Sequence, residues 1–170
     1  MAMRDTIYLY TDGASSGNPG PGGWGAVLKC GDLRKEMSGG FALTTNNRME
    51  LLAVIKGLET ILWENAEVEV WSDSQYVVRA ISEGWLDRWS SRDWKKVKNP
   101  DLWKRFLPLY NKHRVTFHWL RGHAGHPENE RCDKLATDAR SQQDLPHDEW
   151  YEQYGVANKT EIQQDSILLL

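Results

Sequence analysis

Two aspartates stand where segments of alternating apolar and polar residues end. Asp12 follows "IYLYT", and Asp73 closes "VEVWSD". An acid at such a position usually caps the next helix, and this explanation stays open for Asp73. Glu50 shares a predicted helical face with Val54, and burial of this face would desolvate an ionised carboxylate at a cost in free energy. The ordinary alternative is that Glu50 lies near the helix N-terminus, where the helix dipole stabilises its negative charge. These acids can act together only if the fold makes them neighbours.

A shared position for the acids would create a metal site. If the segments around 6–12 and 67–73 are adjacent parallel strands, their C-terminal ends bring Asp12 and Asp73 together, and the helix carrying Glu50 packs across that edge. Asp133 in "NERCDKLA" is the fourth candidate. Clustered carboxylates cannot all stay ionised without cations, and Mg²⁺ prefers oxygen ligands. A pair of such ions would balance the acids and form the clamp used for in-line displacement at phosphorus.

The glycine-rich stretch "YTDGASSGNPGPGGWG", residues 10–25, suggests a phosphate-binding loop at first sight. It lacks the Gly-Lys-Ser/Thr ending of that loop, and no helical pattern follows it. Alternation resumes instead in "GWGAVLKCG". We therefore interpret the glycines as a link between two strands.

The hydrophobic periodicity predicts an α/β fold. Alternation predicts strands, and apolar residues at helical spacing predict helices, one of them with Asn46 or Asn47 as its N-cap. The predicted strands cover about 6–12, 23–31, 33–42, 67–73 and 114–120, and the predicted helices cover 46–63, 75–83, 100–112 and 127–140. A three-strand meander followed by a βαβ unit implies a mixed sheet with helices on its faces.

Composition is that of one soluble domain. The chain has 170 residues, of which 40% are hydrophobic and 26% charged, and no apolar run is long enough for a membrane span. We expect a cytoplasmic protein that does not bind membranes, with Cys30 and Cys132 as free thiols. The net charge of -3 hides a basic block, since residues 85–105 hold seven Lys/Arg against three Asp.

Five motifs resemble, in order and spacing, those of bacterial ribonuclease H of type 1: "YTDGASSGNPGPGGWG", "TTNNRMELL", "SDSQYV", "KNPDLW" and "GHAGHPENERCDKLA". The resemblance covers about residues 5–140. It implies a ribonuclease H-like fold, with a mixed five-stranded sheet in the order 3-2-1-4-5 and an antiparallel second strand. It also implies two-metal cleavage of the RNA strand of RNA/DNA hybrids, with Mg²⁺ or, as a substitute, Mn²⁺, leaving 3'-hydroxyl and 5'-phosphate ends. No small-molecule cofactor is expected.

The resemblance assigns roles residue by residue. The family's metal-binding acids fall on Asp12, Glu50, Asp73 and Asp133, and its mobile catalytic histidine falls on His123. Glycines on both sides of His123 would let it swing toward the metal site and help release the 3'-oxygen. A zinc site formed by His123, His126 and Cys132 is a weaker alternative, because no further Cys or His pair completes it.

A hybrid-cleaving nuclease needs contacts to 2'-hydroxyls and phosphates rather than to bases. By resemblance, these contacts come from Asn18, Thr45, Asn46, Asn47 and Gln75. Helix capping is the ordinary alternative for Asn46 and Asn47. The family's basic substrate-binding region falls on the basic block, where Trp85, Trp89, Lys95, Lys96 and Lys98 are the candidates. Packing in the core is the alternative for the tryptophans.

The C-terminal part of the chain lies beyond the resemblance. We expect a catalytic domain over residues 1–140 and an acidic extension over 141–170 that is partly ordered or flexible and carries a net charge of -5 from six acids and one lysine. Either the aromatic "EWYEQYGV" packs on the domain, or the acidic segment competes with substrate phosphate, in which case cutting after Ser141 leaves turnover nearly intact.

The leading hypothesis is a monomeric ribonuclease H. Another two-metal phosphoryl-transfer enzyme, such as a transposase or resolvase domain, and a hybrid-binding module without chemistry are the alternatives. The amide set argues against the first alternative. The second would lack a carboxylate, and the sequence retains all of them.

Overall fold

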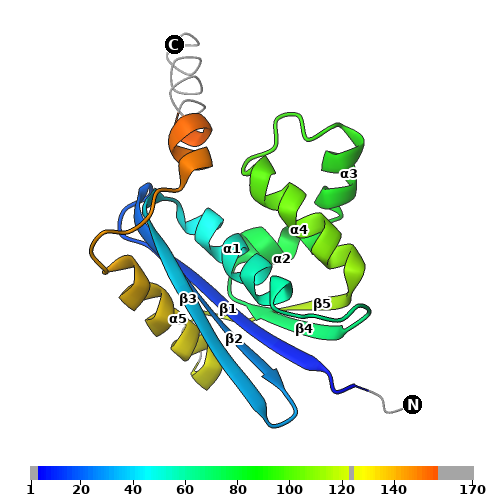
Figure 1. Ribbon diagram of the computed structural model, residues 1–170. Helices are drawn as coiled ribbons and strands as arrows, with labels where there is room; N and C mark the ends of the chain where they lie inside the picture. The colour runs from blue at the N-terminus through cyan, green and yellow to red at the C-terminus, as the bar shows by residue number, and fades with distance from the viewer. Residues whose placement is uncertain (1–3, 123–124, 157–170) are drawn as a thin grey trace.

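The computed structural model describes residues 4–122 and 125–156 of the chain. Strands dominate its first third, and helices alternate with strands after it (Figure 1). In chain order the elements are β1 (Ile7–Ser15), β2 (Gly20–Cys30), β3 (Leu33–Thr44), α1 (Asn46–Glu59), β4 (Glu67–Ser72), α2 (Gln75–Ser82), α3 (Trp85–Ser91), α4 (Pro100–Lys112), β5 (Arg114–Trp119), α5 (Pro127–Arg140) and the short π-helical turn η1 (Tyr151–Gly155).

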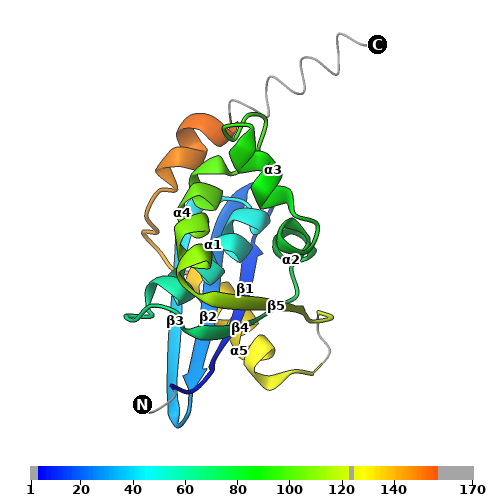
Figure 2. The ribbon, with the colours of Figure 1, turned by 90° about the vertical axis from the view of Figure 1, so that its right-hand side faces the viewer.

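The strands form one mixed sheet in the order β3-β2-β1-β4-β5. Strand β2 is antiparallel to both of its neighbours, while β1, β4 and β5 are parallel. The predicted α/β class, strand order and antiparallel second strand are confirmed. Helix α5 covers β1, β2 and β3 on one face, and α1 packs on β1 and β2 from the other, on the side where α4 also lies (Figures 1 and 2).

The ends of several strands and helices differ from the sequence-based predictions. Strand β1 continues to Ser15 and β2 begins at Gly20, so most of the glycine-rich stretch is strand and only residues 16–19 link the two. Helix α1 ends at Glu59 rather than near residue 63. The sequence does not predict α3, because seven residues are too few to display a helical period, and Gly84, with a φ of 68°, separates it from α2.

The first turn of α1 is capped by Thr45, not by Asn46 or Asn47 as predicted. Thr45 has extended backbone angles, φ -124° and ψ 160°, and its hydroxyl accepts a hydrogen bond from the Arg48 N–H at 3.3 Å. A threonine hydroxyl satisfies one of the free N–H groups of a helix start. The side chains of Asn46 and Asn47 are therefore not needed for capping.

The hydrophobic core lies between the sheet and the helices on the α1 side. Leu9, Leu51, Val70, Trp103 and Phe106 are fully buried there. Burying such side chains contributes about 1.5–3 kcal/mol each, so this layer holds the strands and helices that carry the acids in place. Within residues 4–122 and 125–156, no helix is long and apolar enough to cross a membrane.

The beginning of the C-terminal extension is ordered against the sheet. The Ala42 N–H of β3 donates to the Pro146 carbonyl at 2.9 Å, and the Thr44 hydroxyl donates to the Asp148 carboxylate at 2.6 Å. Tyr151 in η1 is buried. These contacts favour the alternative in which the aromatic part of the extension packs on the domain.

Candidate active site

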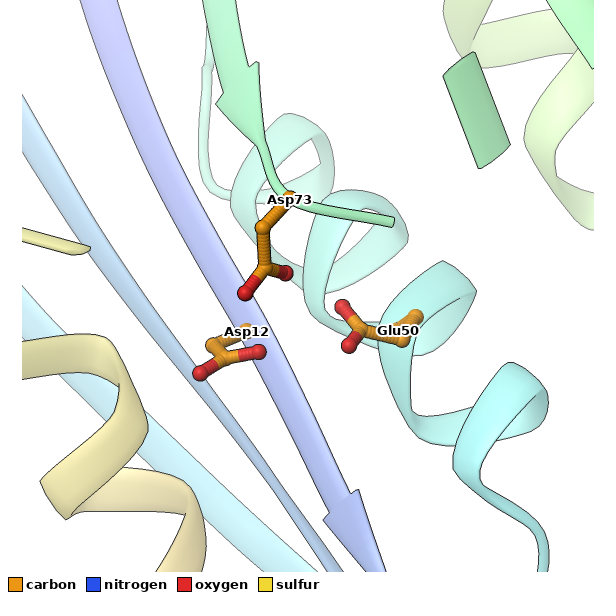
Figure 3. A group of neighbouring side chains, drawn as sticks. All are labelled: Asp12, Glu50 and Asp73. Carbon is orange, nitrogen blue, oxygen red and sulfur yellow. The ribbon is translucent and has the colours of Figure 1, made fainter. Parts of the chain in front are cut away.

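Asp12, Glu50 and Asp73 converge beside the C-terminal half of β1 (Figure 3). Thr11 of β1 pairs with Ser72, the last residue of β4, so the two residues that follow, Asp12 and Asp73, stand at the same level of the parallel pair. Because β4 ends there, this edge of β1 is open, and Glu50 reaches it from α1. One oxygen of each carboxylate lies within 4.8 Å of the others.

Two glycines allow the helices to approach the sheet this closely. A Cβ on Gly13 would collide with the backbone of α1 at Glu50. A Cβ on Gly25, which pairs with Asp12 across β1 and β2, would collide with the α5 backbone at Cys132. The missing side chains therefore set how near the acids on the helices come to Asp12.

Crowding and burial change how the acids titrate. Burial, followed by the negative charge of Asp73, raises the pKa of Asp12 from its ordinary 3.8 to about 8, although hydrogen bonds with Glu50 and the Gly13 N–H oppose this. Burial and the charges of Asp12 and Asp73 also raise the pKa of Glu50 well above 4.5. Without a cation, the cluster therefore retains protons near neutral pH. A bound cation would replace them.

The cluster fits a divalent metal ion. The buried Oε2 of Glu50 has no hydrogen-bond partner among the described residues, and such an unsatisfied oxygen is costly. All of the available donors are carboxylate oxygens, which suit hard cations. In the described part of the chain, this is the only group of three or more acids, histidines and cysteines that could hold an ion.

The zinc alternative finds no support. Cys132 is buried in α5, and its Sγ lies 3.2 Å from the Tyr10 carbonyl oxygen. Burial raises the pKa of this thiol, which disfavours the thiolate form that zinc binds. Cys132 is part of the packing between α5 and β1.

Comparison with known proteins supports the same chemistry. The RNase H family model matches residues 4–141 of the chain. The chain belongs to the ribonuclease H family. The relative from Desulforamulus reducens, named Ribonuclease H, is 57% identical over 147 residues, which cover 84% of this chain and 92% of the relative. The Ribonuclease H of Rippkaea orientalis is 53% identical over 155 residues, which cover 88% and 94%. The chain is therefore an enzyme of the nuclease class.

Solved structures of ribonuclease H proteins share the fold. LC9-RNase H1, described as a type 1 RNase H with the type 2 active-site motif, superposes with a TM-score of 0.76 at 28% identity, over 93% of this chain and 86% of that chain. LC11-RNase H1 in complex with an RNA/DNA hybrid superposes with a TM-score of 0.59 at 29% identity, over 79% and 96%.

Asp133 and His123, the other two predicted catalytic residues of this ribonuclease H, are not part of the cluster of three acids among the described residues. Asp133 on α5 is partly exposed and is not among the clustered acids, but its charge makes a minor contribution to the raised pKa of Asp12. His123 lies outside the described residues. The residue before it, Gly122, stands beside the triad, since a Cβ there would be 3.4 Å from Asp73 Oδ2. The His123 assignment remains a prediction.

The polar residues predicted to contact substrate lie on the segments that border the acids. Asn18 in the β1–β2 link accepts a hydrogen bond from the Asn46 N–H at 3.2 Å, which ties that link to the start of α1. Asn47 and Gln75, the latter two residues after Asp73, are exposed. Thr45 is the helix cap described above. Exposed amides therefore stand on the helix that carries Glu50 and shortly after the strand that leads to Asp73.

The basic block divides into a core part and an exposed part. Trp85 and Trp89 are partly buried, and the Trp89 ring centroid lies 5.3 Å from that of the fully buried Trp103. These contacts favour core packing for the tryptophans. Lys95, Lys96 and Lys98, in contrast, are exposed on the connection between α3 and α4.

Sequence reasoning missed one buried cation near the site, Arg48. It lies in the first turn of α1, two residues before Glu50, and its carboxylate partners are Asp101 and Asp148. A cation is unfavourable at a helix N-terminus, so an arginine in "NNRMELL" indicates that acids from elsewhere in the chain offset its charge. Nothing in the sequence around Asp148 indicates that it is one of those acids.

Proposed function

We propose that this ribonuclease H is an endonuclease that cleaves the RNA strand of RNA/DNA hybrids and leaves 3'-hydroxyl and 5'-phosphate ends. The observation that carries the proposal is the convergence of Asp12, Glu50 and Asp73, whose oxygens lie within 4.8 Å of one another. The substrate class is supported by LC11-RNase H1, which was solved in complex with an RNA/DNA hybrid.

The proposed cofactors are two Mg²⁺ ions, with Mn²⁺ as a substitute, held by Asp12, Glu50, Asp73 and Asp133. When bound, such ions supply Lewis-acid stabilisation of an in-line displacement at phosphorus. The residues of this chain supply the negative charge that holds them. Asp12 and Glu50 must release their protons for this, because burial and crowding raise both pKa values in the free protein.

The exposed groups around the acids would hold the hybrid. Short amides suit the shallow minor groove of a hybrid, where 2'-hydroxyls are displayed, and the lysines suit the phosphates. His123 would assist the departure of the 3'-oxygen as a proton carrier. The proposed substrate contacts are Asn18, Thr45, Asn46, Asn47, Gln75, Trp85, Trp89, Lys95, Lys96 and Lys98.

The remaining parts of the proposal concern the whole chain. Residues 1–140 would form the catalytic domain, and the protein would act as a monomer in the cytoplasm without a small-molecule cofactor. Trp85 and Trp89 are partly buried, which supports a proposed contact through their exposed edges only.

A panel of duplexes tests this function. The protein is incubated with an end-labelled RNA/DNA hybrid, double-stranded RNA and double-stranded DNA of the same sequence, with Mg²⁺ present. We expect cleavage within the RNA strand of the hybrid alone, and products that a 5'-phosphate-dependent exonuclease degrades. Equal cleavage of double-stranded RNA or DNA would contradict the proposed substrate class.

A further inference from the structure

Arg48 is a buried cation whose donors are all used. Its side chain is 3% exposed, and its guanidinium donates to two carboxylates at once. Nε and Nη2 lie 2.7 and 3.0 Å from the Asp148 oxygens, and Nη1 and Nη2 lie 2.8 and 2.7 Å from those of Asp101. The second hydrogen of Nη1 points to Asn99 Oδ1 at 3.3 Å. Paired geometry of this kind fixes the positions of its partners.

Asn99 links Arg48 to α2 through a hydrogen bond to Tyr76. Its amide nitrogen donates to the Tyr76 hydroxyl oxygen at 3.1 Å, and the indole N–H of Trp103 donates to the same oxygen at 2.9 Å. The Tyr76 hydroxyl in turn faces the Lys98 carbonyl at 3.5 Å. A continuous hydrogen-bond chain, here called the Arg48 network, therefore runs from Asp148 through Arg48, Asn99 and Tyr76 to Lys98.

The segment that ends in this network is residues 92–98, here called the basic loop. It carries the exposed Lys95, Lys96 and Lys98. Its backbone is unusual, because non-glycine residues in and next to it take positive φ angles: Asp93 (53°), Trp94 (59°), Lys96 (59°) and Asn99 (56°). Such angles are unfavourable for L-residues and persist only where surrounding contacts impose them.

The contacts that impose this conformation lie within the basic loop and directly after it. Trp94 and Val97, inside the loop, pack on the hydrophobic core, and Asn99, the residue after the loop, is held by the Arg48 network. Asp148 belongs to the C-terminal extension and accepts hydrogen bonds from the same Arg48 guanidinium that donates to Asn99. The extension thus reaches the basic loop through Arg48.

We propose that the Arg48 network holds the basic loop in the conformation that presents its lysines to the phosphates of the hybrid, and that residues 142–156 contribute to substrate affinity through Asp148. This inference rests on the proposed function. Arg48, Asn99 and Tyr76 are positioning residues, because they act through the lysines and not on the reacting atoms. If the loop were free, only a fraction of molecules would present the lysines correctly, and the apparent affinity would fall by that fraction.

The test compares variants that loosen the loop without removing a charge. Tyr76→Phe deletes the central hydroxyl, and Asn99→Gly deletes the side chain while keeping a residue that accepts a positive φ. Tyr110→Phe is the matched control, since Tyr110 stacks on Phe106 and packs against the same core. Steady-state kinetics on a labelled hybrid are measured at several salt concentrations, well below the melting temperature.

For Tyr76→Phe and Asn99→Gly we expect KM to rise about fivefold while kcat stays within about twofold, because binding and not chemistry loses its support. The slope of log KM against log salt should fall by about one, the amount expected for one lost phosphate contact. In a variant that already carries Lys95→Ala, Lys96→Ala and Lys98→Ala, Tyr76→Phe should add nothing. Asp148→Asn should raise KM in the same direction.

Other outcomes would overturn the inference. A lower melting temperature with unchanged KM and salt slope would show that the network only stabilises the fold, and additive effects of Tyr76→Phe and the lysine substitutions would show that it acts elsewhere. An Asp148→Asn variant with normal KM would show that the C-terminal extension does not contribute to substrate affinity through Asp148. Wild-type protein is assayed first, because absence of hybrid cleavage there would contradict the proposed function and not the network.

Discussion

Replacing Asp12 by asparagine should abolish hybrid cleavage and at the same time stabilise the metal-free fold. Asn keeps the Oδ1 oxygen that accepts the Gly13 N–H at 2.9 Å, so the local geometry is retained. It removes one negative charge from a buried cluster in which Glu50 and Asp73 remain. The substitution therefore removes a carboxylate ligand that the metal needs, and it also removes the repulsion between this carboxylate and those of Glu50 and Asp73.

The size of the effect follows from the pKa of Asp12. A carboxyl whose pKa rises from 3.8 to about 8 on folding costs about 4 kcal/mol of stability at pH 7. We expect about 2 kcal/mol of this to be recovered in Asp12→Asn, because the new amide N–H₂ must itself be desolvated. The cost is absent below the unfolded pKa of 3.8 and grows until the pH passes about 8. The stability difference between variant and wild type should therefore grow with pH over that window.

The assay is urea unfolding in EDTA from about pH 4 to about pH 9, repeated with Mg²⁺. With Mg²⁺ the wild type should gain stability and the variant should not, since only the wild type binds the ion tightly. Asp138→Asn, at an exposed position of α5, is the control and should change stability by less than about 0.5 kcal/mol at every pH. In EDTA, an Asp12→Asn protein that is less stable than wild type at pH 8, or a stability difference that does not change with pH, would show that Asp12 is not destabilised by the neighbouring acids.

Three further predictions concern other parts of the chain. His123→Ala should lower kcat about 100-fold with a much smaller change in hybrid binding, and a defect in KM alone would contradict its role in the chemical step. Burial lowers the pKa of His113, so below pH 6.5 the unfolded chain binds a proton that the native state does not; the free energy of unfolding of wild type minus that of His113→Gln, measured with urea, should therefore fall as the pH drops below 6.5. Cutting after Ser141 should lower the melting temperature by about 6–12 °C, because about 3 kcal/mol is lost when Asp148 leaves Arg48; an unchanged melting temperature would contradict this.

The sheet and the acid cluster could be predicted because each depends on a local pattern. Alternation identifies β1 and β4, and the acids stand where that alternation ends. Glu50 stands out as a charge on an apolar helical face. Parallel neighbours then bring Asp12 and Asp73 together without further information, and the structure has this arrangement.

What could not be predicted depends on distant parts of the chain. Thr45 was preferred over the asparagines as the cap because of the backbone angles at the end of β3, which the sequence does not display. Arg48 is paired with Asp148, 100 residues away, and no periodic signal connects them. The basic loop owes its conformation to positive φ angles at residues such as Trp94, which are uncommon for that residue type.

The central claim is that Asp12, Glu50 and Asp73 hold the metal ions that drive cleavage of the RNA strand. The most direct measurement is the rate of RNA-strand cleavage in a labelled hybrid for wild type and Glu50→Gln, each with Mg²⁺ and with EDTA. We predict rapid cleavage only for wild type with Mg²⁺, while Glu50→Gln remains folded. Cleavage by wild type in EDTA, or normal turnover in Glu50→Gln, would contradict the claim.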